Sequence, residues 1–211
     1  MRVVPPPAVL EHLRRHPWRP GIRRAPPGWR RGPSLLALLL VLPLAGEAEP
    51  EKDVRFQPSP MPVVRAMLEL AGVGPGDVVY DLGSGDGRIP ITAAREYGAR
   101  GVGIDIDPDL IAQARLRARE LGVADRVTFI EGDMYAADVR EATVVTLFLH
   151  PEPNLKLRPK LRRQLPPGAR VVSYVWDMGD WQPDAVRELN NRRIYLWRIP
   201  SAGRSAHTPK R

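Results

Sequence analysis

The stretch that most constrains the fold is residues 78–88, in which a short apolar run ends at an acid and passes into a loop with glycine at alternate positions. The apolar run favours a buried strand, and Pro90 stands where the first turn of a helix tolerates proline. Glycine can adopt positive φ and, without a Cβ, lets a ligand lie against the backbone. We therefore predict a strand, a tight loop and a helix whose N-terminal N–H groups point at a ligand.

The loop favours a ligand that carries positive charge. Its glycines, Gly83, Gly85 and Gly87, follow the spacing G-x-G-x-G, whereas a dinucleotide loop has G-x-G-x-x-G and holds a pyrophosphate. Asp81 and Asp86 place carboxylates where a pyrophosphate would be repelled. S-adenosylmethionine suits such a loop, because it carries an α-ammonium and a sulfonium.

A second predicted strand, residues 101–106, also runs into acidic residues. Asp105 lies about 20 residues beyond the glycine loop, the distance at which an α/β unit presents a carboxylate to ribose hydroxyls. The other interpretation makes Asp105 a helix cap, but Asp107 followed by Pro108 is the better cap. We therefore predict that Asp105 binds the ribose of an adenosine ligand.

A third predicted strand, residues 127–131, is followed by Asp133 and Met134. Open α/β sheets bind ligands at the carboxyl ends of their strands, so we expect Asp133 to accept a hydrogen bond from the adenine amino group and Met134 to cover the ring. Alternatively, Asp133 caps the next turn. The predicted cofactor-binding residues are Asp81, Gly83, Ser84, Gly85, Gly87, Asp105, Ile106, Asp133 and Met134.

A fourth predicted strand, residues 143–149, leads into a polar loop, residues 150–154, that we expect to face the methyl donor. Methyl transfer to nitrogen needs a lone pair in line with the methyl group and a route for a proton. The candidate catalytic residues are therefore His150, Glu152 and Asn154. The alternatives are that His150 caps the strand and that Glu152 is solvated.

Aromatic and basic residues surround a fifth predicted strand, residues 169–176. Trp176 and Trp181 either line an acceptor pocket or belong to the core. The preceding helix, residues 155–165, carries five Lys and Arg residues that form a solvated face or receive an acidic substrate.

The strands alternate with helices, among them an amphipathic helix at residues 62–71. This alternation predicts an α/β, Rossmann-like fold with a mainly parallel twisted sheet and helices on both faces. A further β-rich run, residues 193–199, is expected to pair as an edge strand.

The N-terminal segments differ in composition from the rest of the chain. Residues 1–33 mix Pro and Arg without apolar periodicity and are predicted to be a disordered leader. Residues 34–48 form a short apolar run between a positive flank and small residues, as in a secretory signal. They indicate export or membrane association; the protein is cytoplasmic if translation starts later or the run is not a signal.

The remaining segments complete the predicted organisation. Residues 49–60 form a linker whose last three residues either fold over the cofactor as a lid or begin the next helix with Ser59 as its cap. The cofactor-binding domain is expected at residues 61–200, and residues 201–211 form a polar tail.

Charge and cysteine content exclude several functions. The first 34 residues contain eight arginines and one acid and so carry nearly all of the formal net charge of +8. The body is nearly neutral, which does not favour nucleic acid as a partner. The chain has no cysteine, so a disulfide framework, a thiolate nucleophile and a cysteine metal site are excluded, and no metal site is predicted.

Residues 81–88, together with Asp105 and Asp133, resemble the class I, seven-stranded S-adenosylmethionine-dependent methyltransferases. Over residues 54–182 the wider pattern is similar to the small lysine methyltransferases related to the mitochondrial enzyme that modifies the ATP synthase c subunit, and to their bacterial relatives. The resemblance implies that Asp81, Gly83, Gly85 and Asp105 hold the cofactor.

The chain departs from that family pattern at a few positions. Asp105 and Asp107 stand where the mitochondrial proteins have Glu and Asn, and the loop at residues 150–154 is not theirs. These changes leave the predicted cofactor unaltered, but they bear on the identity of the substrate.

We predict an enzyme that transfers a methyl group from S-adenosylmethionine directly, in line, to a deprotonated lysine amine of a protein substrate, and that is a monomer. An acidic or carbonyl group near Glu152 is expected to steer the ammonium into the site. The alternatives are a methyltransferase for RNA or a small molecule, and a non-catalytic module that only binds the cofactor. Fold alone does not separate these functions.

Overall fold

The computed structural model describes residues 57–200 of the chain. The predictions for the leader, the signal-like run, most of the linker and the C-terminal tail fall on residues 1–56 and 201–211, outside the described part. In the described part, no helix is long and apolar enough to cross a membrane.

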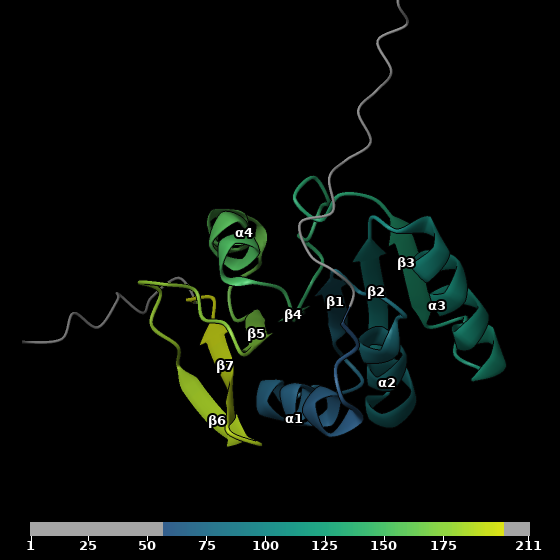
Figure 1. The fold of residues 1–211 in the computed structure, drawn as a ribbon, viewed down its shortest axis with the longest axis horizontal. Helices are drawn as coiled ribbons and strands as arrows, with labels where there is room; N and C mark the ends of the chain where they lie inside the picture. Colours follow the sequence, from purple (N-terminus) through teal and green to yellow (C-terminus); the bar gives the residue numbers. More distant parts are fainter. Residues whose placement is uncertain (1–56, 201–211) are drawn as a thin grey trace, which may run out of the picture. The chain divides into compact units, whose positions relative to one another are not determined.

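Helices and strands alternate through most of the described chain (Figure 1). In order, the elements are α1 (Met61–Ala71), β1 (Val78–Leu82), α2 (Arg88–Tyr97), β2 (Arg100–Asp105), α3 (Pro108–Glu120), β3 (Val127–Glu131), β4 (Val144–Leu147), α4 (Pro151–Gln164), β5 (Arg170–Tyr174), β6 (Ala185–Leu189) and β7 (Arg192–Arg198).

The strands form a seven-stranded sheet in the order β3-β2-β1-β4-β5-β7-β6. The first five strands in this order are parallel, whereas β7 is antiparallel to both β5 and β6. This architecture confirms the predicted Rossmann-like fold. The prediction of an edge strand at residues 193–199 is wrong, because β7 lies inside the sheet and β6, which the sequence analysis missed, forms the edge.

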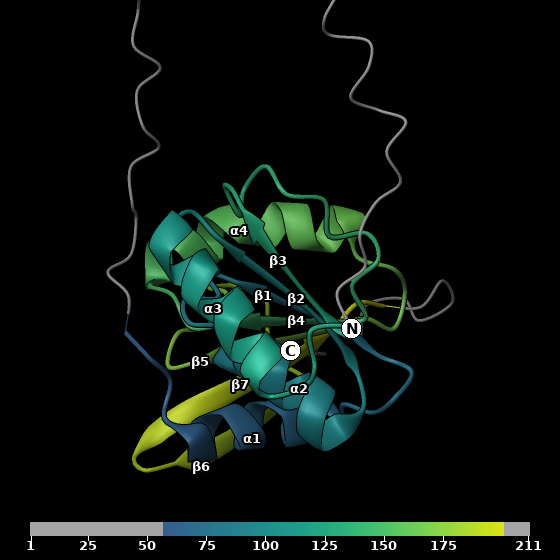
Figure 2. The same cartoon turned by 90° about the vertical axis from the view of Figure 1, so that its right-hand side faces the viewer.

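The two faces of the sheet carry different helices (Figure 2). Successive residues of β1 point to opposite faces, as in any strand. Tyr80 and Leu82 pack in the cluster that contains α4, whereas Val79 packs in the cluster with α1 and α2. A third cluster joins α2 and α3 over β3. The helices therefore hold β1 in the centre of the core. The carboxyl end of β1 borders the candidate active site that is described below.

The helix boundaries follow local chemistry. Asp107 caps α3 by accepting hydrogen bonds from the main-chain nitrogens of Asp109 (3.0 Å) and Leu110 (3.4 Å), as predicted, and Pro108 occupies the first turn. The predicted loop at residues 150–154 is instead the start of α4, which begins at Pro151. Prolines fit the first turn of a helix because the N–H groups there have no intrahelical partner.

Candidate active site

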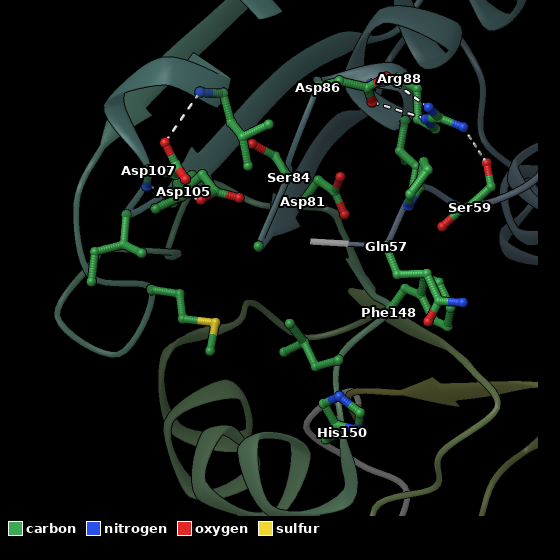
Figure 3. Close-up of a pocket in the computed structure, with 18 of the residues that line it drawn as sticks. Gln57, Ser59, Asp81, Ser84, Asp86, Arg88, Asp105, Asp107, Phe148 and His150 are labelled. Atoms are coloured by element: carbon green, nitrogen blue, oxygen red, sulfur yellow. Dashed lines mark hydrogen bonds and ion pairs between the residues drawn. The ribbon is translucent and has the colours of Figure 1, made fainter. Parts of the chain in front are cut away.

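A cavity of about 710 Å³ lies at the carboxyl ends of β1 to β5, where open α/β sheets bind ligands. Its walls come from the loops after five strands, from the segment before α1 and from the first residue of β7. Figure 3 shows Asp81, Ser84 and Asp105 on one side of this cavity and His150 on the other. We call these two sides the cofactor end and the acceptor end.

The glycine loop lines the cofactor end. Gly83, Gly85 and Gly87 all have positive φ, at 79°, 51° and 74°. A Cβ added to Gly87 would come within 2.5 Å of the ring of Phe129, so this position has room only for glycine. The loop is tied to β2 by two main-chain hydrogen bonds to the oxygen of Ile104, at 2.9 and 3.0 Å. It is therefore a rigid concave surface that brings backbone close to a ligand.

Asp105 connects the glycine loop to the end of β2. Its Oδ2 accepts a hydrogen bond from the main-chain nitrogen of Gly85 (2.7 Å), and its Oδ1 accepts one from that of Asp107 (3.0 Å). The carboxylate also lines the cavity, and each oxygen keeps a second lone pair that can accept from a ligand hydroxyl. This arrangement suits the predicted role as a ribose acceptor.

Asp81 is the most deeply placed acid of the site, with 3% of its surface exposed. The Thr146 hydroxyl donates to its Oδ1 at 2.7 Å. Burial raises the pKa of Asp81 to about 7, the Thr146 hydrogen bond opposes that rise, and the nearby charges of Asp105 and Asp86 add to it. Close by, the Ser84 hydroxyl is buried and has no hydrogen-bond partner within the described residues. Both groups are suited to a polar, cationic ligand.

Asp86 lines the cavity and is paired with two arginines. It accepts hydrogen bonds from Arg88 Nε (2.8 Å) and Nη2 (2.7 Å), and from Arg117 Nη1 (2.7 Å). Burial opposes ionisation of Asp86, but the hydrogen bonds and charges of Arg88 and Arg117 outweigh it and lower its pKa. The two arginines offset the charge of Asp86, and its predicted effect on the choice of ligand stays a prediction.

The segment before α1 borders the cofactor end. Arg88 Nη1 donates to the main-chain oxygen of Ser59 at 2.7 Å, and Gln57, Pro58 and Ser59 line the cavity (Figure 3). The residue that caps α1 is Pro60, without a side-chain cap, so Ser59 does not cap the helix. Of the two interpretations of residues 58–60, a segment that folds over the cofactor as a lid fits this geometry better than a helix start capped by Ser59.

The remaining predicted cofactor residues also line the cavity. Ile106, Asp133 and Met134 stand after β2 and β3. Asp133 Oδ1 accepts a hydrogen bond from the main-chain nitrogen of Tyr135 at 2.8 Å, so it caps the turn as in the alternative interpretation. Its place in the wall leaves Oδ2 available to a ligand, and the adenine contact stays a prediction.

The acceptor end is apolar and aromatic. Phe148, His150, Val175 and Trp176 line it, and the ring centroids of His150 and Trp176 are 6.4 Å apart. Val175 has φ of 75°, a strained value for a β-branched residue and one that clusters at functional sites. Trp181 does not line this cavity but packs on Trp197, with ring centroids 5.8 Å apart, so it belongs to the core as the alternative held.

Two of the three candidate catalytic residues do not reach the cavity. Because α4 begins at Pro151, Glu152 points outward on its first turn and Asn154 is fully buried. The Asn154 amide donates to Ser173 Oγ (3.0 Å) and to the oxygen of Trp176 (3.1 Å). Asn154 therefore fixes the backbone that carries Trp176, and His150 is the member of the set that lines the site.

The sequence analysis missed several wall residues, among them Phe148, Val175 and Arg192. Phe148 is the last residue but one of the fourth predicted strand and could have been assigned to the site from its position near a carboxyl end. The positive φ of Val175 has no sequence signal. Arg192 enters the wall only because the hairpin of β6 and β7 folds back beside β5.

Comparisons with known proteins agree with this geometry. A family model described as the ANTKMT methyltransferase domain matches residues 81–185. The chain is 42% identical over 151 residues to the protein-lysine N-methyltransferase of Saccharolobus islandicus, which spans 69% of this chain and 94% of that protein. It is 34% identical over 178 residues to the mouse adenine nucleotide translocase lysine N-methyltransferase, spanning 84% and 70%.

One solved structure has a higher sequence identity to this chain than these two relatives have, and it covers about as much of the chain as the Saccharolobus protein does. The crystal structure of an RNA methyltransferase from Salinibacter ruber in complex with S-adenosyl-L-homocysteine is 60% identical, has a TM-score of 0.67 and covers 68% of this chain and 94% of that chain. S-adenosylhomocysteine is what remains of S-adenosylmethionine once the methyl group is transferred.

The residues of the cofactor end fit S-adenosylmethionine. The glycine loop leaves room for a ligand, Asp105 can accept from ribose hydroxyls, and the buried Ser84 hydroxyl lacks a partner within residues 57–200. When bound, the cofactor supplies a methyl group made electrophilic by the sulfonium. The site, the 42% and 34% identical relatives and the matching family model together show that this chain is an S-adenosylmethionine-dependent methyltransferase and belongs to the family with the ANTKMT methyltransferase domain.

Proposed function

We propose that the protein methylates the side-chain amine of lysine in a protein substrate. The observation that carries the proposal is that one cavity joins the acidic cofactor end to an apolar and aromatic acceptor end. A lysine side chain has a four-carbon apolar stem and a cationic tip. Phe148, Val175 and Trp176 suit the stem, and an aromatic face attracts an ammonium.

The chain's own residues would act mainly by positioning and by excluding water. Direct transfer requires the lysine nitrogen to lose its proton and to lie in line with the methyl group, and correct placement supplies much of the rate enhancement. His150 lines the acceptor end, and an imidazole nitrogen there can take part in proton removal. We assign it the catalytic role that the sequence analysis gave to three residues.

The names of the relatives support a protein substrate. The Saccharolobus protein is named for protein lysine, and the mouse protein for a lysine of the adenine nucleotide translocase. Both align over more than two thirds of this chain. A monomeric state and membrane association through the leader stay predictions.

RNA methylation is the second candidate, because the 60% identical Salinibacter structure is described as an RNA methyltransferase. His150 and Trp176 can also stack on a base. Against this, residues 57–200 carry 19 Lys and Arg and 19 Asp and Glu, and Asp81, Asp105 and Asp133 line the cofactor end without an arginine partner among the described residues. A body with no net charge and an acidic cofactor end is a weaker electrostatic match for a long phosphate backbone than for a single acidic side chain.

The test uses the full-length protein, a cell lysate and S-adenosylmethionine with a labelled methyl group. Label that resists ribonuclease, is released by protease and is recovered as methyl-lysine is the expected result. Asp105→Ala is the inactive control. Label released by ribonuclease would establish the RNA function instead, and binding without any transfer would indicate a non-catalytic module.

A further inference from the structure

We propose that Arg192 forms a binding site for a negatively charged side chain next to the acceptor lysine, so that the enzyme prefers lysines beside Asp or Glu. The inference rests on the proposed lysine methylation and deepens it by defining the substrate class.

Arg192 lies where the substrate residues next to an acceptor lysine would be placed. It lines the acceptor end of the main cavity and also a second cavity of about 450 Å³ that shares Val175 with the first. Glu188, Asn191, Arg193 and Tyr195 supply the other walls of the second cavity, and the Glu188 carboxylate pairs with Arg193 at 3.4 Å. A lysine inserted in the main cavity can therefore place a neighbouring residue in the second one, against Arg192.

The backbone holds Arg192 in place. Asn190 and Asn191 have φ of 51° and 58°, the left-handed values of a tight two-residue hairpin turn between β6 and β7. The main-chain nitrogen of Val175 donates to the oxygen of Arg193 at 2.8 Å, which ties the start of β7 to the acceptor end. Arg192 is thus presented at a fixed place rather than on a loose loop.

The charge of Arg192 is available to a ligand. Its side chain is exposed and makes no ion pair or hydrogen bond with another residue in the part of the chain that the structure describes. Arg193 beside it is within 3.4 Å of Glu188, and Arg88, the other cation in the wall of the main cavity, is bound by Asp86. An arginine fork without a carboxylate is suited to receive one from a substrate.

The wider charge distribution points the same way. Residues 57–152 carry 9 Lys and Arg against 15 Asp and Glu, whereas residues 153–200 carry 10 against 4. The cofactor end belongs to the acidic segment, and Arg192 belongs to the basic one. Such a separation attracts an acidic surface to the acceptor side and orients it on approach.

The experiment compares wild-type protein with Arg192→Glu and with Arg198→Glu. Arg198 is the matched control, because it is an exposed arginine at the other end of β7 and an even number of residues away, on the same face of the strand. Each full-length protein methylates a native lysate and a chymotryptic digest of it, and methylated lysines are mapped by mass spectrometry. Rates are then measured on synthetic peptides with one lysine flanked by Glu, Gln or Arg.

We expect wild-type protein and Arg198→Glu to prefer the Glu-flanked over the Arg-flanked peptide by about fivefold in kcat/KM, the upper end for a favourable exposed ion pair. Arg192→Glu should lose or reverse that preference while keeping its affinity for S-adenosylmethionine.

The outcomes separate the two proposals. Methyl-lysines without enrichment of neighbouring acids, or a preference that Arg192→Glu leaves intact, would overturn the role of Arg192 while lysine methylation stands. Absence of methyl-lysine from both the lysate and the digest would overturn the proposed function and the role of Arg192 with it.

Discussion

Arg88 donates a hydrogen bond from Nη1 to the main-chain oxygen of Ser59 at 2.7 Å, which links the glycine loop to a segment 29 residues earlier in the chain. Asp86 holds the rest of the guanidinium group, so its orientation is fixed. Because Ser59 lines the cavity, this contact makes Arg88 a positioning residue for the cover of the cofactor end.

Arg88→Ala is therefore expected to weaken S-adenosylmethionine binding about tenfold, the effect of losing one hydrogen bond to a charged group. Isothermal titration calorimetry measures the change, and Arg95→Ala, an exposed position on the same helix, is the control. The acceptor KM should stay within about twofold of the wild-type value. Equal cofactor affinity in the two variants would rule out this role for Arg88.

Asp105→Ala should abolish tight cofactor binding and also lower stability. The substitution removes the acceptor for the nitrogens of Gly85 and Asp107, and unsatisfied buried N–H groups cost about 1–3 kcal/mol. We expect at least a tenfold loss in S-adenosylmethionine affinity and a measurable fall in the free energy of unfolding in urea. Asp109→Ala, exposed on α3, should change neither quantity. An Asp105→Ala protein with wild-type affinity would disprove the ribose assignment.

Asp81 gives the protein a specific dependence of stability on pH. Its pKa is raised from 3.8 to about 7 in the fold, so between about pH 4 and pH 7 the folded state holds a proton that the unfolded state has released. The contribution of this group to the free energy of unfolding is therefore greatest below about pH 4 and falls, by as much as about 4 kcal/mol, as the pH rises to 7.

Asp81→Asn removes the titration and keeps an oxygen that can accept from Thr146. The difference in unfolding free energy between wild-type protein and Asp81→Asn should thus shift in favour of the variant from pH 4.5 to pH 7.5. Urea titrations across this range provide the measurement. A difference that stays constant with pH would show that Asp81 is ionised in the fold throughout.

Asn154→Ala tests whether this residue acts through structure rather than chemistry. Its amide bonds to Ser173 and to the backbone at Trp176 are buried, so the variant should lose about 1–3 kcal/mol of stability. The acceptor KM should rise because Trp176 is less well held, with a smaller effect on kcat. Glu152→Gln, exposed on the same turn, is the matched control. A large fall in kcat at unchanged stability would restore a catalytic role to Asn154.

The cofactor half of the protein could be predicted from sequence because its signals are local. Glycine spacing, an acid at a strand end and an Asp-Pro cap each depend on a few adjacent residues. The apolar face of the amphipathic helix predicted at residues 62–71 is buried in α1, where it comprises Val63, Val64, Met67, Leu68 and Ala71. The whole of β3 has the predicted bounds.

The acceptor half could not be predicted as well, because it depends on contacts between distant segments. β6 is a short edge strand with exposed charged residues, so its apolar pattern is weak. Without β6 the hairpin was missed, and with it the position of Arg192. The role of Asn154 was misassigned because prolines at 151 and 153 were interpreted as loop residues, although they also fit the first turn of a helix.

The position of β7 has a consequence for the order in which the two ends of the cavity can form during translation. β7 is the last strand of the sheet in chain order, yet it pairs with β5 in the interior and brings Arg192 beside Val175. On the ribosome, β1 to β4 and the glycine loop emerge well before residue 192. A growing chain can thus complete the cofactor end first, whereas the wall that contains Val175 and Arg192 is complete only after the last strand has been translated.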